Sequence, residues 1–140
     1  MIKLKYIYFF IIFIFFTNLN ADINHFQKGK NLFEEKKYDL AKFKFEQDIV
    51  FNPKNENSYL FLAKIYKFKK NDNLEETNLK TVILLNPKNE EAILNLALLK
   101  IRKSNYSEAK KLINSFKIVC KTLCQEKSDL QKKLDNILEK

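Results

Sequence analysis

Asn-Pro-Lys-Asn at residues 52–55 occurs again at residues 86–89, and these two tetrapeptides contain both prolines of the chain. The spacing between the prolines is therefore 87 − 53 = 34, in a sequence otherwise free of proline. A 34-residue period in which proline closes each unit is typical of a helix-turn-helix repeat that stacks into a solenoid. Because the chain also has a single glycine, it offers little turn material for β-hairpins, and we expect an all-α fold.

Small residues recur with the same period. If Asn-Pro marks the end of a unit, three segments align, namely 22–53, 56–87 and 90–121. Gly29, Ala63 and Ala97 then occupy one equivalent position, separated each time by the spacing of the two prolines. A small residue at a fixed place of each helix pair predicts that the two helices cross closely there. Unrelated amphipathic helices would repeat only their internal i, i+3, i+4 spacing, so they do not explain this recurrence.

The middle segment carries the most specific pattern. It reads Tyr59-Leu-Phe-Leu-Ala63-Lys-Ile-Tyr66, which is an aromatic residue, leucine, a small residue and a second aromatic residue. This resembles the first helix of the tetratricopeptide (TPR) repeat, and the resemblance extends over residues 22–121. It implies a TPR-like α-α superhelix of three helix-turn-helix repeats followed by a capping helix. In the third segment Lys100 occupies the place of the second aromatic residue.

The same resemblance implies that each second helix opens with an aromatic residue, followed three positions later by a small one. Two segments fit, with Tyr38 and Ala41 in the first and Tyr106 and Ala109 in the third. The middle segment has Asp72 and Glu75 at these places, so its second helix is expected to start late or to pack loosely. Asp48 and Phe116 also replace residues that are usually alanine.

Residues 122–140 do not begin a fourth repeat. Ser128-Asp-Leu-Gln131 has the form of a capping box, which predicts a helix start at Ser128. Leucine and isoleucine then form one apolar stripe, at Leu130, Leu134, Ile137 and Leu138. An open solenoid end requires such a cap, although the stripe would serve equally as a coiled-coil seam in a dimer.

The N-terminal residues 1–21 have the three parts of a secretory signal peptide. Two lysines precede an apolar run at residues 6–16, and a polar stretch ends at Ala21, where we expect cleavage. The run is shorter than the roughly 20 residues that span a bilayer. An uncleaved anchor in the inner membrane is the alternative. Either case predicts an exported protein of the periplasm or cell envelope.

The chain carries a net charge of +9, from 26 basic and 17 acidic residues. Lys3 and Lys5 lie in the N-terminal segment, so the remainder carries 24 − 17 = +7. A solvated lysine-rich surface is the simplest interpretation, and an anionic membrane face or an acidic partner are the alternatives. The lysines are not interleaved with aromatic residues in the way that single-stranded nucleic acid requires, so we expect no nucleic acid.

Cys120 and Cys124 are the only cysteines, and they lie where the third segment ends. In an exported protein they can form a disulfide that pins the turn before the cap. Across a continuous helix this spacing is marginal for a disulfide, so a helix break between them is expected. Free buried thiols are one alternative, and a thiol-active helper in envelope redox chemistry is another.

Nothing in the sequence indicates catalysis. One histidine, His25, and two adjacent cysteines cannot form a metal cluster, so we expect no metal and no cofactor. The phosphate-binding and nucleophile motifs of enzymes are missing, which predicts a protein without enzymatic activity or a small-molecule substrate. The acidic pairs are interpreted as solvated helix faces or first-turn acids; they are Glu34-Glu35, Glu75-Glu76 and Glu90-Glu91.

By the TPR resemblance, the first helices of the repeats line a concave groove. The residues expected to face it are Phe26, Lys30, Phe33, Leu60, Lys64, Lys67, Leu94, Leu98 and Ile101. This set is apolar with a basic edge and suits an amphipathic helix or an extended segment with acidic flanks. Alternatively, the C-terminal helix covers its last three members. The sequence thus predicts a non-catalytic adaptor of the bacterial cell envelope that binds a segment of a partner protein, or else a membrane-anchored scaffold.

Overall fold

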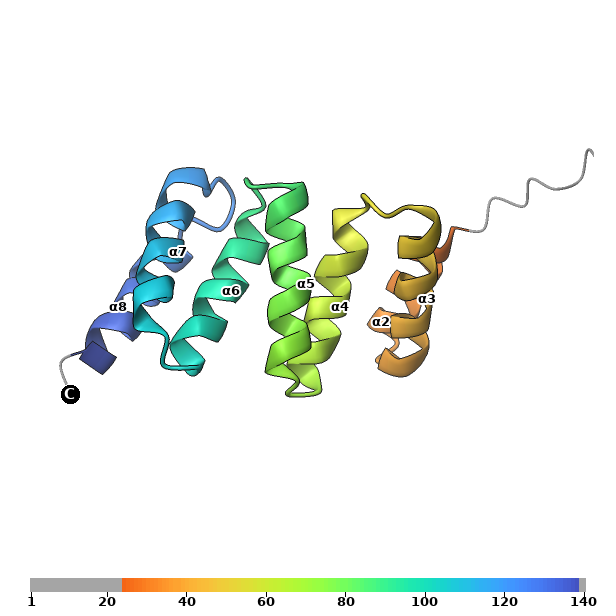
Figure 1. The fold of residues 1–140 in the computed structure, drawn as a ribbon, viewed down its shortest axis with the longest axis horizontal. Coiled ribbons are helices and arrows are strands. Elements are labelled where there is room, and N and C mark those ends of the chain that lie inside the picture. Colours follow the sequence, from red (N-terminus) through yellow and green to blue (C-terminus); the bar gives the residue numbers. More distant parts are fainter. Residues whose placement is uncertain (1–23, 139–140) are drawn as a thin grey trace, which may run out of the picture.

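The computed structural model describes residues 24–138, which form seven α-helices (Figure 1). They are α2 (His25–Glu34), α3 (Tyr38–Phe51), α4 (Glu56–Phe68), α5 (Asp72–Leu85), α6 (Glu90–Arg102), α7 (Tyr106–Val119) and α8 (Glu126–Leu138). The prediction of an all-α fold is confirmed. The predicted signal peptide, residues 1–21, lies outside the described residues. Within residues 24–138 no helix is long and apolar enough to cross a membrane.

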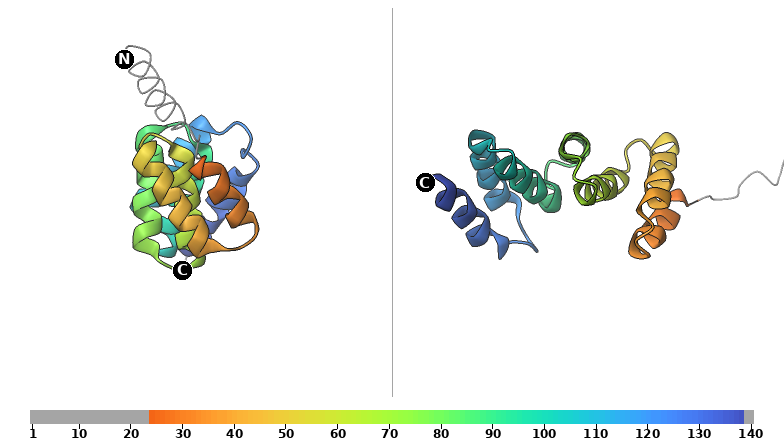
Figure 2. Two further views of the ribbon diagram at one scale, coloured as in Figure 1. Left: turned by 90° about the vertical axis from the view of Figure 1, so that its right-hand side faces the viewer. Right: turned by 90° about the horizontal axis from the view of Figure 1, so that it is seen from below.

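The helices form three antiparallel pairs, α2 with α3, α4 with α5 and α6 with α7, and each pair packs against the next. The pairs lie side by side in one row, which is bent rather than straight (Figure 2). Helix α8 packs against α7 and α6 and closes the row. This is the predicted superhelix of helix-turn-helix repeats with a capping helix. Its contacts run between sequence neighbours, so each repeat depends on the next for a complete core.

The repeat period continues in the helix boundaries. The second helices α3, α5 and α7 begin at Tyr38, Asp72 and Tyr106, so α5 does not start late, as the sequence suggested. The side chain of Asn71 accepts the backbone N–H of Leu74 and caps α5. An asparagine cap starts a helix without the aromatic residue that is missing there.

The turns inside the three pairs share one backbone conformation. Lys36, Lys70 and Ser104, which again follow the repeat period, have φ of 59°, 55° and 57°. At the first of these turns, the N–H of Lys37 donates to Leu32 O and that of Lys36 to Phe33 O. This is the Schellman ending of a helix, which usually carries glycine at the left-handed position.

The close crossing predicted at Gly29 is present. A Cβ atom placed on Gly29 would lie 2.7 Å from Cε1 of Phe45, closer than two carbon atoms can approach. Ala63 and Ala97, the equivalent residues, are also buried. The small residues therefore allow the first and second helices of each pair to touch.

Asp48 is buried although it is charged. Its carboxylate accepts hydrogen bonds from the Ser58 hydroxyl, from Asn55 Nδ2 at 2.7 Å and from Asn52 Nδ2 at 3.1 Å. In the next repeat the places of Asp48 and Ser58 are taken by Val82 and Ala92, both fully buried. The first connection between pairs is thus held by a satisfied polar cluster where the second has an apolar contact.

The capping box predicted at Ser128 is wrong, because α8 already begins at Glu126. The N–H of Glu126 donates to Leu123 O and that of Lys127 to Cys124 O, so a backbone turn starts the helix two residues earlier. Leu130 and Leu134 pack into the core of α6 and α7. They are buried within the chain and therefore cannot form a coiled-coil seam at the same time.

Candidate partner-binding groove

The nine residues predicted to face a groove lie on the first helices α2, α4 and α6. They form three rows at the repeat period: Phe26, Leu60 and Leu94; Lys30, Lys64 and Leu98; Phe33, Lys67 and Ile101. The shared period gives them equivalent places in successive repeats. They differ strongly in what they contact, and three parts of this face can be distinguished.

At the first repeat the face is an aromatic cluster centred on Phe61. The Phe61 ring lies 5.8 Å from Phe26 and 5.1 Å from Phe33, measured between ring centroids, and stacks on Phe45 at 5.0 Å. Lys64 Nζ lies 4.9 Å from the centroid of Phe61. Phe61 was not among the predicted residues, because its position corresponds to neither aromatic place of the repeat pattern.

At the middle repeat the two lysines are bound by the neighbouring helix. Lys64 Nζ lies 2.7 Å from a carboxylate oxygen of Glu91, and Lys67 Nζ donates to Asn95 Oδ1 at 3.0 Å. Glu91 and Asn95 are one turn apart on α6, which is the spacing that faces both toward α4. The predicted basic edge is therefore partly neutralised by α6, and sequence reasoning did not include these two partners.

At the third repeat the apolar residues are partly covered. Leu94, Leu98 and Ile101 are half-buried and pack against the core cluster that contains Leu130 and Leu134 of α8. This core is built jointly by α6, α7 and α8, so the alternative considered from the sequence, cover by the C-terminal helix, stays a prediction. In the middle repeat Leu60 is also only 6% exposed, so its side chain belongs mainly to the core.

A cavity of about 640 Å³ opens between α4, α6 and the segment that leads into α8. It is lined by Asn57, Leu60, Lys88, Asn89, Glu90, Glu91, Leu94, Asn95, Thr122, Leu123 and Glu126. Two of the nine predicted residues, Leu60 and Leu94, contribute to it. Amide and charged groups surround this small apolar floor, so the cavity is more polar than the sequence suggested.

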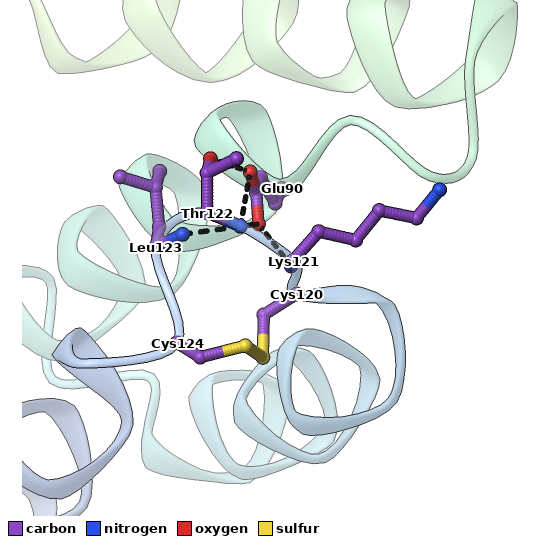
Figure 3. The surroundings of a disulfide bond; sticks show 6 residues. All are labelled: Glu90, Cys120, Lys121, Thr122, Leu123 and Cys124. Atoms are coloured by element: carbon purple, nitrogen blue, oxygen red, sulfur yellow. Dashed lines mark hydrogen bonds between the residues drawn. A yellow bond between two sulfur atoms is a disulfide. The ribbon is translucent and has the colours of Figure 1, made fainter.

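The wall of the cavity is fixed by Glu90, at the first turn of α6. Its carboxylate accepts the backbone N–H groups of Lys121 at 2.6 Å, Thr122 at 3.1 Å and Leu123 at 3.3 Å (Figure 3). The Thr122 hydroxyl also donates to it. These hydrogen bonds lower the pKa of Glu90 to about 2, and the bond from the Thr122 hydroxyl makes the largest contribution. Glu90 therefore stays ionised and holds the segment in place.

The two cysteines lie at the ends of this same segment (Figure 3). Their sulfur atoms are 2.24 Å apart and their Cα atoms 5.2 Å apart, which is within the range of disulfides. Helix α7 ends at Val119, so the expected helix break separates the two residues. The segment is thus closed at its base by the cysteines and bound at its tip by Glu90.

A second cluster of charges connects α5, α6 and α7. Lys100, which is buried, lies 2.7 Å from Glu76 and 2.9 Å from Glu108. Arg102 lies 2.7 Å from Glu75, a carboxylate only 1% exposed, whose pKa is raised by burial and lowered in part by Arg102. Glu75 and Glu76 therefore do not form a solvated face, but Glu75 lies in the first turn of α5, as the other interpretation of these acids predicts. Three helices share these ion pairs, so no single stretch of sequence could indicate them.

The groups that line the cavity can form hydrogen bonds, ion pairs and apolar contacts. No group of three or more histidine, cysteine, aspartate or glutamate side chains in residues 24–138 is placed to hold a metal ion. The groups that converge on the cavity are three side-chain amides, three leucines, a threonine, one lysine and three carboxylates. These can bind a polypeptide segment by hydrogen bonds and apolar contact.

Comparison with solved structures identifies the fold as that of TPR domains. The Yersinia enterocolitica type III secretion translocator chaperone SycD superposes with a TM-score of 0.78 at 14% identity, covering 89% of this chain and 92% of SycD. The first TPR of Spaghetti (RPAP3), bound to an HSP90 peptide, gives 0.74 at 19% identity with 83% and 91% covered. The TPR2B domain of yeast Sti1, in complex with an Hsp70 peptide, gives 0.74 at 15% identity with 80% and 94% covered. No model of a protein family and no curated protein matches the sequence. The likeness that these comparisons show is therefore one of fold alone.

Proposed function

We propose that this protein is a non-catalytic adaptor that binds a segment of a partner protein in the cavity between α4, α6 and the 120–124 segment. The observation that carries the proposal is the convergence of Asn57, Asn89 and Asn95 around the apolar floor formed by Leu60 and Leu94. The Asn57 side chain makes no hydrogen bond within residues 24–138, whereas Asn89 and Asn95 already bond to Glu56, Lys67 and the backbone of α6 and each keep one amide N–H. These remaining groups can pair with the backbone of a segment, and the leucines can accept one apolar side chain. The bound peptides of Spaghetti and Sti1 support a peptide ligand for this fold.

The charges around the cavity define the partner further. Lys64 and Lys67 are already bound to Glu91 and Asn95, so fewer positive groups face a ligand than the lysine content suggests. Lys88 lines the cavity and forms no ion pair within residues 24–138. Glu90 and Glu126 place negative charge at the same cavity. We therefore expect a segment with an apolar anchor residue and a polar or mixed-charge flank, rather than a strongly acidic tail.

We further propose that the protein acts outside the cytoplasm, in the periplasm or cell envelope. The signal-peptide pattern of residues 1–21 supports export, and two cysteines whose Cα atoms are 5.2 Å apart, close enough for a disulfide, suit an oxidising compartment. The N-terminal mass of the protein purified from envelope fractions distinguishes cleavage after Ala21 from a retained anchor. Alkylation of the cysteines before reduction reports their redox state in the cell.

Site-specific photocrosslinking in cells tests the groove. A photoreactive residue at Asn57, which is exposed at the cavity rim, should capture a partner that the same residue at Asn114 does not. Asn114 is a matched control, since it is an exposed asparagine on the second helix α7. The captured segment, made as a peptide, should bind the wild type and lose at least tenfold in affinity when Asn57→Trp fills the cavity. Equal capture at both positions, or a peptide indifferent to Asn57→Trp, would disprove the groove.

A further inference from the structure

The solenoid has two long edges that differ in chemistry. One edge, called here the loop edge, contains the connections between pairs at residues 52–55 and 86–89 and the segment 120–125. The other, called the turn edge, contains the turns inside pairs at residues 35–37, 69–71 and 103–105. In Figure 1 the loop edge is the upper one and the turn edge is the lower one.

The loop edge carries an exposed apolar residue in every repeat. Val50, Leu84 and Ile118 are 76%, 81% and 83% exposed and occupy one equivalent position of the repeat, in the last turns of α3, α5 and α7. Phe51 is 70% exposed beside the first of them. Single exposed apolar side chains are ordinary on protein surfaces, but the same position exposed in three successive repeats forms a row. A row of this kind indicates a contact surface.

Each of these apolar residues is followed closely by a lysine. Lys54, Lys88 and Lys121 are exposed, and none of them belongs to an ion pair of the described residues. On the turn edge four cations are paired with carboxylates, whereas Lys36 and Lys70 are exposed and form no ion pair within residues 24–138. The turn-edge pairs are Lys37 with Glu35, Lys69 with Asp39, Arg102 with Asp72 and Lys103 with Glu76. The positive charge of the loop edge is therefore available to an external anion.

The carboxylates near the loop edge are directed to other groups. Glu56 accepts hydrogen bonds from Asn86 and Asn89, and Glu90 binds the backbone of the 120–124 segment. Glu91 is paired with Lys64, and Glu126 lines the cavity. Glu56 and Glu90 bind neutral donors and keep their negative charge, and Glu126 forms no ion pair within residues 24–138. These three carboxylates are half-buried, however, whereas Lys54, Lys88 and Lys121 are exposed and reach further outward.

The N-terminal end of the described chain lies at the same edge. Helix α2 begins at His25, and the His25 ring stacks on Phe51 with 5.4 Å between centroids. In the sequence, the apolar run of residues 6–16 ends 25 − 16 = 9 residues before His25.

We propose that the loop edge is a membrane-contact surface that rests on an anionic lipid bilayer. Val50, Leu84 and Ile118 enter the boundary between headgroups and acyl chains, and the adjacent lysines bind lipid phosphates. Apolar side chains flanked by lysine are the pattern of proteins that lie on anionic membranes. This contact involves the ends of the second helices and the loops. Lys88 also lines the cavity, so the two surfaces adjoin, but Val50, Leu84 and Ile118 lie outside the cavity lining.

Tryptophan fluorescence tests the proposal directly, because the chain contains no tryptophan. Leu84→Trp places one probe on the loop edge, and Phe68→Trp places the control on the last residue of α4, 60% exposed at the turn edge. The full-length variants are mixed with phosphatidylcholine vesicles with or without phosphatidylglycerol, whose acyl chains carry bromine near the headgroup. We expect the emission of the Leu84→Trp variant to shift to the blue and to be quenched in the anionic vesicles, while that of the Phe68→Trp variant stays unchanged.

Charge reversal provides the second arm. Lys54→Glu/Lys88→Glu/Lys121→Glu should abolish the quenching of Leu84→Trp, since each lysine near an anionic surface changes binding about fivefold. Reversal of three exposed lysines elsewhere, at Lys36, Lys70 and Lys110, is the matched control and should have a smaller effect. Circular dichroism verifies that each variant is folded.

Three outcomes would overturn the proposal. The emission of the Leu84→Trp variant could remain that of water-exposed tryptophan in anionic vesicles, or both probes could be quenched equally, as for a domain without a preferred orientation. Alternatively, light scattering could detect a dimer that Val50→Glu/Leu84→Glu dissociates while lipid has no effect. The last result would assign the loop edge to a second copy of the chain.

Discussion

Gly29→Ala is expected to destabilise the first repeat, although alanine favours helices. The added Cβ would lie 2.7, 2.9 and 3.1 Å from three carbon atoms of the Phe45 ring. The ring has little room to move, because it is fully buried, stacks on Phe61 at 5.0 Å and packs against Phe26 at 5.9 Å. Helices α2 and α3 must therefore separate slightly to accept the methyl group.

Two opposing terms set the magnitude. Overpacking of a core by one methyl group costs about 1–3 kcal/mol. Replacing glycine by alanine inside a helix returns about 1 kcal/mol through helix propensity. The net loss in the free energy of unfolding is thus about 1 kcal/mol, which lowers the Tm by about 4 °C for a domain of this size.

A double-mutant cycle isolates the contact. The second repeat carries Ala63 and Leu79 where the first carries Gly29 and Phe45, and both are buried in one core cluster. Phe45→Leu alone should cost about 1–2 kcal/mol, less than a complete truncation to alanine. Combined with Gly29→Ala, it reproduces the residue pair of the second repeat. The double variant should therefore lose about 1 kcal/mol less free energy of unfolding than the two single losses added together.

Urea and thermal unfolding followed by circular dichroism measure all four corners of the cycle. A Gly29→Ala variant that unfolds at a higher temperature than the wild type, as helix propensity alone predicts, would refute the reasoning. A coupling energy of zero in the cycle would refute it as well, since the clash with Phe45 would then not determine the effect.

Three further variants test the connections between repeats. In the oxidised protein, Cys120→Ala/Cys124→Ala should increase hydrogen exchange throughout α8 and lower the free energy of unfolding by about 2 kcal/mol, the chain-entropy value for so short a ring. Identical exchange of the wild type with and without reductant would contradict this. Glu90→Gln should loosen α8 at pH 7 and make its stability depend less on pH in the acid range. The Glu90 carboxyl has a pKa of about 2 in the folded protein and 4.5 ordinarily, so it stabilises the fold above pH 4.5 and loses that effect as the pH falls toward 2. Ser58→Ala should cost about 1–3 kcal/mol by leaving the buried Asp48 carboxylate with one donor fewer, whereas Asp48→Val/Ser58→Ala should recover most of the loss; urea unfolding that ranks the double variant below the single one would exclude this account.

Much of the fold could be predicted because its information is local and periodic. The recurrence of Asn-Pro and of Gly29, Ala63 and Ala97 reports contacts inside each helix pair, and these follow from a helix length and a turn that repeat. Two errors had one origin. At Asp72 an asparagine cap starts α5, as Asn105 does for α7, so the start does not depend on an aromatic residue. At Ser128 a backbone turn started α8 earlier than the capping pattern. In both cases several local signals can start a helix, and hydrogen-bond geometry selects one.

The candidate groove was predictable as a face but not as a site. The repeat spacing placed nine residues on α2, α4 and α6, yet it did not indicate that Leu60 is mostly core or that Lys64 is held by Glu91. A residue's exposure depends on neighbours that are distant in the sequence. The two partners of the hydrogen bonds that build this face and its flank are 24 to 33 positions apart.

By itself the sequence determined the fold class, the number of helix pairs and the small residues at their crossings, because each depends on a pattern repeated along the chain. Only the tertiary structure decided which charges are neutralised and which remain free. Glu90 binds the 120–124 segment and Arg102 binds Glu75 across a repeat boundary, while Lys54 and Lys88 remain outside the ion pairs of residues 24–138. Charged side chains are long and can pair with several neighbours, so their partners are selected by the stacking of repeats and not by the spacing within them.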